Sequence, residues 1–282
     1  MSRPSFAIST HLYHDTPLGR DQLVEIAAHG FDAVELFVNR PHLASDDAPA
    51  VQVIEEALQD SGLRVHSLHA PIAEALRNGR WTGPFSIASS QEAVRSRAVA
   101  EVLASLELAR RLGAGILVVH VGVPDSQQPS AEDNREDAAR RSLEELHAAA
   151  KAAGVRLALE VMPNRLSRAE RLAAWIEDDL DMDDVGICFD FGHAYLAGDV
   201  VDAVEAVSGH LLTTHVHDNH GQIDEHLLPF EGEIGWESAL MAVRKIGYEG
   251  AFVFELAGSA TPRRVLERAQ RVRARFDALL TQ

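Results

Sequence analysis

Two kinds of hydrophobic pattern alternate along the chain. Short runs of β-branched or apolar residues are each followed by a longer amphipathic stretch rich in alanine, leucine, glutamate and arginine. The short runs are typical of buried strands and the long stretches of helices that cover a sheet. Strands are predicted at residues 6–10, 33–37, 63–69, 115–120, 155–161, 185–190, 211–217 and 251–256. Helices are predicted at residues 18–29, 48–61, 91–112, 131–153, 168–179, 200–207, 237–246 and 263–280.

Eight strand–helix units in succession predict a closed (β/α)8 TIM barrel of the α/β class, formed by residues 1–282 as a single domain. An open, doubly wound sheet is the alternative. No turn between a strand and a helix carries the GxGxxG phosphate loop that would favour such a sheet.

The faces of the strands indicate which residues point into the barrel. In the strand at 185–190, Gly186, Cys188 and Asp190 share one face, and larger residues occupy the other. Small side chains suit the narrow interior of a barrel. An acidic residue at the end of such a face lies at the carboxyl end of the strands, where enzymes of this fold keep their active sites.

Most of the predicted strands end on a residue that can bind a metal ion. Six consecutive strands, from the third to the eighth, finish with His69, His120, Glu160, Asp190, His215 and Glu255. Chance would place such a residue at roughly one strand end in five. The mixed oxygen and nitrogen set of Glu160, Asp190, His215 and Glu255 suits Mn, Mg, Co or Zn. A cation would also relieve the repulsion among three close carboxylates.

The composition of the chain limits the partners and the cellular location that can be expected for it. The net charge of −17 weighs against binding to nucleic acids or to anionic membranes, which need a basic surface. Cys188 is the single cysteine, so the chain has no internal disulfide, and a reducing, cytoplasmic location is expected. The first residues lack the apolar segment of a signal peptide, and no apolar run is long enough to span a membrane.

Several motifs carry a resemblance to a known family. In chain order they are HSLHAPI, VVHVG, LALEVMPN, CFDFGHAYLAGD, HVHDNHGQIDEHLLPFEGEIGW and FVFEL. Together they resemble the xylose isomerase-like TIM-barrel superfamily of sugar (phosphate) isomerases and epimerases, to which endonuclease IV is related. The resemblance implies that one divalent ion is bound by Glu160, Asp190, His215 and Glu255.

The same resemblance implies a reaction on a small sugar, keto-sugar or sugar phosphate. Glu160 and Glu255 would remove and return a proton through a metal-stabilised enediolate. His193 would donate a hydrogen bond to a substrate oxygen. The catalytic residues are therefore predicted to be Glu160, Glu255 and His193.

Two alternatives stay open within this superfamily. Endonuclease IV holds three zinc ions with nine residues, and matching positions exist here at His69, His120, Glu160, Asp190, His193, His215, Asp224, His226 and Glu255. A three-zinc phosphodiesterase acting at abasic sites is thus one alternative. Against it, Ile72 replaces an expected aromatic residue, and DFGH stands where Asp-Thr-Cys-His is usual. The other alternative is a dehydratase of the inosose type.

Further residues are predicted to line a substrate pocket. Glu35 shares a strand face with Ala33 and could reach substrate hydroxyls or bond to neighbouring strand ends. Trp81 and Phe85 lie in the long connection at 71–90, which is expected to form either a lid over the site or ordinary loop packing. His217 is expected beside the metal ligands or the substrate. Other residues of this kind are His11 and His14 after the first strand, and Arg80 and Arg165 as the nearest cations for a substrate phosphate. The oligomeric state is left open, a homo-oligomer included.

Overall fold

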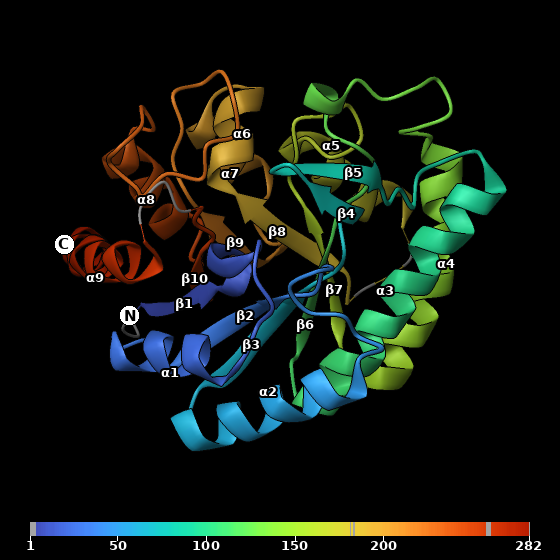
Figure 1. The fold of residues 1–282 in the computed structure, drawn as a ribbon. Coiled ribbons are helices and arrows are strands. Elements are labelled where there is room, and N and C mark those ends of the chain that lie inside the picture. Colours follow the sequence, from blue (N-terminus) through green and yellow to red (C-terminus); the bar gives the residue numbers. More distant parts are fainter. Residues whose placement is uncertain (1–3, 181, 183, 258–260, 282) are drawn as a thin grey trace.

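The protein is a closed barrel of parallel strands surrounded by helices. A computed structural model describes residues 4–180, 182, 184–257 and 261–281 (Figure 1). Eight strands close the barrel in the order β1-β10-β9-β8-β7-β6-β3-β2. They are β1 (Ser5–Ser9), β2 (Ala33–Phe37), β3 (Arg64–His69), β6 (Ile116–Val119), β7 (Arg156–Glu160), β8 (Gly186–Asp190), β9 (Leu211–Val216) and β10 (Ala251–Phe254). The predicted (β/α)8 barrel is confirmed.

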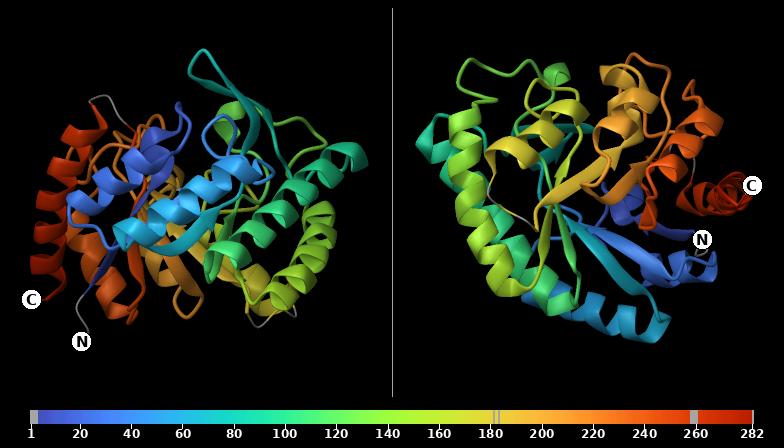
Figure 2. Two further views of the ribbon diagram at one scale, coloured as in Figure 1. Left: turned by 60° about the horizontal axis from the view of Figure 1, so that its bottom comes forward. Right: turned by 180° about the vertical axis from the view of Figure 1, so that it is seen from behind.

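Helices cover the outside of the barrel (Figures 1 and 2). They are α1 (Arg20–Ala28), α2 (Ala48–Ser61), α3 (Glu92–Leu112), α4 (Glu136–Ala153), α5 (Ala169–Ala174), α6 (Phe191–Ala197), α7 (Val200–Ala206), α8 (Trp236–Lys245) and α9 (Pro262–Leu280). Among the described residues, no helix is both long enough and apolar enough to cross a membrane.

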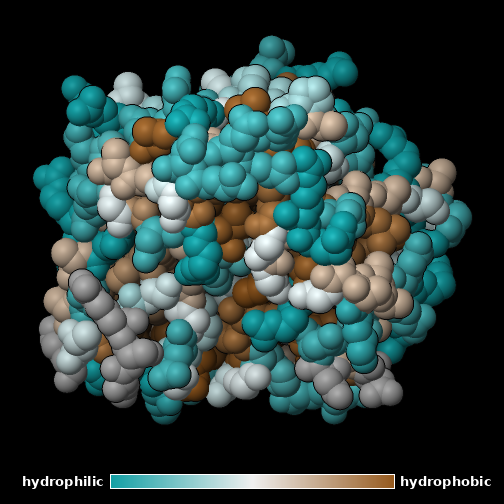
Figure 3. Space-filling model, turned by 90° about the horizontal axis from the view of Figure 1, so that it is seen from below, coloured by the Kyte–Doolittle hydropathy of each residue, from teal (hydrophilic) through white to brown (hydrophobic). Residues whose placement is uncertain are grey.

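Two layers of apolar packing support this architecture. Small clusters fill the inside of the barrel: Ala7, Ala33, Ala251 and Val253 in one, and Ile116, Val118, Ala158 and Cys188 in the other. A much larger cluster lies between the outer faces of the strands and the helices. The molecular surface seen from below the view of Figure 1 is largely hydrophilic, with smaller hydrophobic areas between (Figure 3). The predicted inward phase of Cys188 agrees with this arrangement.

Two helices differ from their predicted bounds by more than two residues. The helix expected at 131–153 begins at Glu136, because Asn134 is held in the preceding loop. Its side chain accepts a hydrogen bond from the amide of Val123 (2.7 Å) and donates one to the carbonyl of the same residue (2.9 Å). The helix expected at 168–179 is α5 followed by a π-helical turn, Trp175–Asp179.

Besides the short 3₁₀ helices η1 (Thr10–Tyr13) and η2 (Asp125–Gln127), a helix and a hairpin have no counterpart in the sequence-based prediction. One is α6, which starts directly after β8; Asp190 ends the strand and caps the helix by accepting a hydrogen bond from the amide of His193 (2.7 Å). The other is a β-hairpin of β4 (Ala73–Arg77) and β5 (Arg80–Pro84), in the segment expected as a loop. It projects from the barrel at the same end as α6 (Figures 1 and 2).

Asn78 and Gly79 form the hairpin turn, with φ values of 51° and 71°. An Asn-Gly pair is the strongest short-range hairpin signal in a sequence, because both residues tolerate the left-handed conformation of a type I′ turn. The sequence therefore carries a local signal for this hairpin at residues 78 and 79.

Candidate metal centre

The carboxyl ends of six strands bring their terminal side chains together. Glu160 and Asp190 are the last residues of β7 and β8, His69 is the last residue of β3, and His215 is the second-last residue of β9. His120 and Glu255 directly follow β6 and β10. Parallel strands in a barrel all end at one rim, so these positions converge although they are far apart in sequence.

The four residues predicted to bind one cation form a compact buried group. One ligand atom from each of Glu160, Asp190, His215 and Glu255 lies within 4.8 Å of the others. His215 Nδ1 is 3.3 Å from Glu160 Oε1, 3.3 Å from Glu255 Oε2 and 3.7 Å from Asp190 Oδ2. The exposed fraction of each side chain is at most 5%. Three carboxylates and one imidazole nitrogen are a donor set that Mn, Mg, Co or Zn accepts.

Glu160 also links the four-residue group to a second one. Its Oε2 lies 3.0 Å from His69 Nε2 and 2.9 Å from His120 Nε2. Within this second group, ligand atoms of His69, Glu160 and His215 lie within 4.8 Å of one another. A carboxylate shared in this way can bridge two cations.

The loop after β9 supplies a third group, formed by His193, His217, Asp224 and His226. Asp224 Oδ2 lies 3.1 Å from His193 Nε2 and 3.0 Å from His226 Nε2. His217 Nε2 lies 3.0 Å from Asp190 Oδ2, while its Nδ1 is buried without a hydrogen-bond partner among the described residues. The structure thus brings together all nine positions that the sequence marked as metal-capable, and it adds His217 to them.

The hydrogen bonds of three histidines fit cation binding. His69, His193 and His226 each place Nδ1 on a backbone carbonyl, those of Ala70 (2.8 Å), Val161 (3.1 Å) and Glu255 (3.0 Å). A carbonyl only accepts, so Nδ1 carries the hydrogen and a neutral ring has its lone pair on Nε2. Each Nε2 faces a carboxylate oxygen, which also accepts. Such contacts require a proton or a cation on the nitrogen.

The histidines and carboxylates of the cluster shift one another's pKa values. Burial raises the pKa of Glu160, but the neighbouring His120 and His215 outweigh it and hold that pKa well below its ordinary value. Burial lowers the pKa of His226, but the charge and hydrogen bond of Asp224 raise it to about 9. Ionised carboxylates therefore surround the positions at which a cation could bind.

A pocket of about 580 Å³ opens onto these groups. Its volume lies within the range usual for small-molecule sites. His69, His120, Glu160, His193, Asp224, His226 and Glu255 line it, together with Trp81 of the hairpin and His11 of the first strand–helix connection. The Trp81 ring packs against Phe37 (centroids 5.8 Å apart) and His14 (5.8 Å), so the hairpin forms one wall of the pocket.

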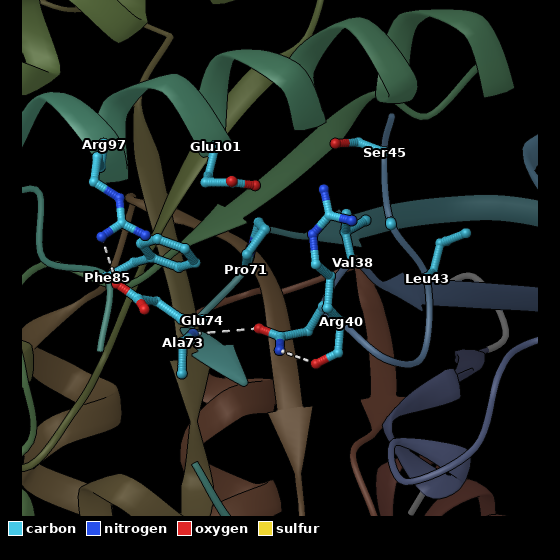
Figure 4. A pocket seen from close by; sticks show the side chains of 12 residues that line it. Val38, Arg40, Leu43, Ser45, Pro71, Ala73, Glu74, Phe85, Arg97 and Glu101 are labelled. Carbon is cyan, nitrogen blue, oxygen red and sulfur yellow. Dashed lines mark hydrogen bonds and ion pairs between the residues drawn. The ribbon is translucent and has the colours of Figure 1, made fainter. Parts of the chain in front are cut away.

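Three of the residues named as candidates for the substrate pocket are not part of its lining, namely Phe85, Glu35 and His217. Phe85 lines a smaller pocket beside Pro71, Glu74 and Arg97, between the hairpin and α3 (Figure 4). Glu35 and His217 are 0% exposed. Glu35 instead contacts Ser67 and His215 at neighbouring strand ends, which is the alternative that the sequence left open for it. His217 lies beside the metal-capable residues, in contact with Asp190, as one of its two expected positions.

The pocket also contains residues that the sequence reasoning missed. Arg168, Gln127 and Gln222 line it from the loops that follow β7, β6 and β9. Arg168 lies in the loop between β7 and α5. Loops that follow barrel strands form the active sites of this fold, so this position is the sequence signal that indicates Arg168. Of the two arginines considered instead, Arg165 donates a hydrogen bond to the carbonyl of Asn134 (2.7 Å) and Arg80 is exposed on the hairpin.

These features define a (β/α)8-barrel protein with groups of metal-capable residues at the carboxyl ends of its strands. The chain belongs to the xylose isomerase-like TIM barrel family, which it matches over residues 23–278.

The relatives of the chain include sugar epimerases. It is 30% identical to the uncharacterized protein MJ1311 of Methanocaldococcus jannaschii over 237 residues, 82% of this chain and 76% of the relative. It is 26% identical to L-ribulose-5-phosphate 3-epimerase UlaE of Salmonella paratyphi A over 236 residues, 80% of this chain and 78% of the relative. A crystal structure of a D-tagatose 3-epimerase-like protein has a TM-score of 0.79 and 25% identity, covering 99% of this chain and 100% of that one.

Proposed function

We propose that the protein is a divalent-metal-dependent isomerase or epimerase of a small sugar, keto-sugar or sugar phosphate. The observation that carries the proposal is the group of Glu160, Asp190, His215 and Glu255, whose ligand atoms lie within 4.8 Å of one another beside the pocket. These four residues would hold one ion, Mn, Mg, Co or Zn. The ion would supply Lewis acidity that makes a C–H next to a sugar carbonyl easier to deprotonate.

Glu160 and Glu255 are the proposed acid–base pair. Both line the pocket, and both approach the same nitrogen of His215 at 3.3 Å, from β7 and from the end of β10. One carboxylate would take the proton from carbon and the other would return a proton, which inverts the carbon or moves the carbonyl. His193 also lines the pocket. Burial lowers its pKa, but Asp190 and Asp224 outweigh this effect and hold that pKa well above its ordinary value, so the protonated ring would donate a hydrogen bond from Nε2 to a substrate oxygen.

Arg168 is the proposed contact for an anionic group of the substrate. It is the one arginine or lysine that lines this pocket in the described part of the chain. The loop that carries it is firmly held: Ser167 Oγ donates to the carbonyl of Val121 (2.6 Å), and Asn164 Oδ1 accepts from the amide of Ser167 (3.0 Å). A guanidinium presented from a rigid loop suits a phosphate or carboxylate group. The similarity to a ribulose-phosphate epimerase supports a phosphorylated ketose as the first substrate to test.

Solvent exchange tests this function directly. The protein, loaded with Mn²⁺, would be incubated in D₂O with a panel of ketoses and ketose phosphates, and deuterium at the carbon next to the carbonyl would be followed by NMR. We expect exchange with at least one member of the panel, its loss in Glu160→Gln, and full activity in the surface variant Glu56→Gln. Retained exchange in Glu160→Gln would refute the role of this carboxylate.

A three-zinc phosphodiesterase is the second candidate. The observation that favours it is the presence of three adjacent donor groups, which together contain all nine matching positions. Elemental analysis of protein purified without chelators or a His-tag separates the candidates. About one ion per chain supports the sugar enzyme, whereas about three zinc ions per chain would require an incision assay on abasic duplex DNA before any sugar is tested.

A further inference from the structure

Glu35 occupies an unusual position beneath the candidate metal centre. It lies in the middle of β2, its side chain points into the barrel, and it is 0% exposed. Its Oε2 accepts a hydrogen bond from Ser67 Oγ (2.7 Å) and contacts His215 Nε2 (3.2 Å). Its Oε1 is buried without a hydrogen-bond partner among the described residues.

Packing alone does not account for this carboxylate. A buried charge costs free energy unless it is fully paired, and one oxygen of Glu35 has no hydrogen bond. An apolar side chain of similar size would fill the same space without that cost. The contact with His215 is therefore the feature that distinguishes glutamate from an apolar residue here.

His215 also differs from three other histidines of the site. The rings of His69, His193 and His226 each place one nitrogen on a backbone carbonyl. His215 lies within a barrel strand, where the neighbouring carbonyls are used by the sheet. Its second nitrogen faces the carboxylate of Glu35 instead.

This contact sets the orientation of the His215 ring. Glu35 Oε2 accepts the hydrogen of Nε2, which leaves the lone pair of the neutral ring on Nδ1. Nδ1 is the atom that lies 3.3 Å from the oxygens of both Glu160 and Glu255. A carboxylate on the far nitrogen of a ligating histidine also makes the ring a stronger donor.

We infer that Glu35 is a positioning residue for the metal centre, which orients His215 and strengthens it as a ligand, and that Ser67 holds Glu35 in place. The inference rests on the proposed function, because it needs a cation bound by His215. It assigns Glu35 no contact with the substrate.

The test measures metal binding without catalysis. The Kd for Mn²⁺ would be determined by electron paramagnetic resonance of free Mn²⁺ in titrations of the wild-type protein and of Glu35→Gln, Ser67→Ala and the control Glu25→Gln. Glu25, on α1, accepts a hydrogen bond from the Tyr13 hydroxyl (2.9 Å) and belongs neither to the lining of the pocket nor to the metal-capable groups. Melting temperatures of the metal-free proteins would be recorded in parallel.

We expect Glu35→Gln to raise the Kd about 10- to 100-fold, the usual effect of removing such a partner. Ser67→Ala should raise it several-fold, and it tests the same chain of contacts if Glu35→Gln folds poorly. A Kd equal to that of the wild-type protein in both variants would overturn the inference. A lower melting temperature of the metal-free variants, without a change in Kd, would also overturn it, because Glu35 would then act only on stability. Absence of Mn²⁺ binding in the wild-type protein would instead refute the proposed function, and the inference with it.

Discussion

His42 is a buried histidine that the fold keeps neutral. It is 3% exposed, its Nδ1 donates to the carbonyl of Thr16 (2.7 Å), and its Nε2 has no hydrogen-bond partner in the described structure. Burial lowers its pKa from 6.5 to about 4. Unfolding restores the ordinary pKa, so below pH 6.5 the unfolded chain binds a proton that the folded protein excludes.

This residue predicts a pH dependence of stability. As the pH falls from 6.5 towards 4, His42 should lower the free energy of unfolding by about 2–3 kcal/mol, and most of its effect should be absent at pH 7. Urea unfolding of the wild-type protein and of His42→Gln at several pH values would measure the difference. Parallel stability curves for the two proteins over this range would contradict the prediction.

Arg168 predicts a selective effect on charged substrates. Replacing it with glutamine should raise the KM for a ketose phosphate by about 10- to 100-fold, since hydrogen bonds to charged groups contribute about 1.5–3 kcal/mol. The kinetic constants for an uncharged ketose should change little. Steady-state kinetics of Arg168→Gln, with Arg80→Gln on the hairpin as control, would show this split. An equal rise for charged and uncharged sugars would argue against anion recognition.

The short helix α6 depends on a residue without a side chain. A Cβ atom at Gly192 would lie 2.0 Å from Cε1 of His217. The His217 ring is fully buried and stacks on His226 with centroids 4.1 Å apart, so it has little room to move.

Gly192→Ala should therefore displace His217 and destabilise the protein by about 1–3 kcal/mol, as overpacking does in other cores. Thermal unfolding would measure this change. Gly115→Ala is a matched control, because a Cβ there meets nothing within 4 Å. Equal stability of the two variants would mean that the contact between α6 and the histidine group is less tight than described.

Helices and strands could be predicted where they are long enough and where a local sequence signal marks their ends. The barrel strands follow from apolar runs of four to six residues, and their predicted bounds agree with the structure to within about two residues. The helix α6 was missed because it begins at Asp190 without a separating loop. The hairpin was not predicted, although Asn78-Gly79 marks its turn. Most residues of β5 are exposed, so this strand lacks the apolar run that indicates a buried strand.

At the scale of the whole molecule, the candidate metal centre concentrates negative charge in a protein that is already strongly acidic. Three carboxylates and His215 meet at one rim of the barrel in a chain whose net charge is −17. A bound divalent cation would relieve the repulsion among these carboxylates. Any ion that binds only the folded state also stabilises it by mass action.

Removal of metal should accordingly destabilise the protein. At a free Mn²⁺ concentration 100-fold above the Kd, the gain is about 2.7 kcal/mol, and the melting temperature should fall by roughly 5–10 °C when a chelator removes the ion. Differential scanning calorimetry with Mn²⁺ and with a chelator measures the shift. Asp190→Asn is the control, and its melting temperature should change little when the chelator is added. A shift equal to that of the wild-type protein would mean that the ion binds elsewhere.

The sequence by itself determined the class of fold and the residues that gather at the rim. Strand and helix periods are local properties, and parallel strands that close into a barrel bring their ends to one side whatever the details of packing. Glu160, Asp190, His215 and Glu255 could therefore be grouped before any coordinates were known.

Only the tertiary structure decided which of the remaining side chains face the pocket. The sequence indicated the strand face of Glu35 and left open whether it reaches the substrate or neighbouring strand ends; in the fold it contacts His215 and Ser67 and does not line the pocket. Phe85 and Arg168 both lie in connections, whose paths are set by distant contacts such as Ser167 Oγ with the carbonyl of Val121. Such contacts join residues far apart in the chain, and no local pattern encodes them.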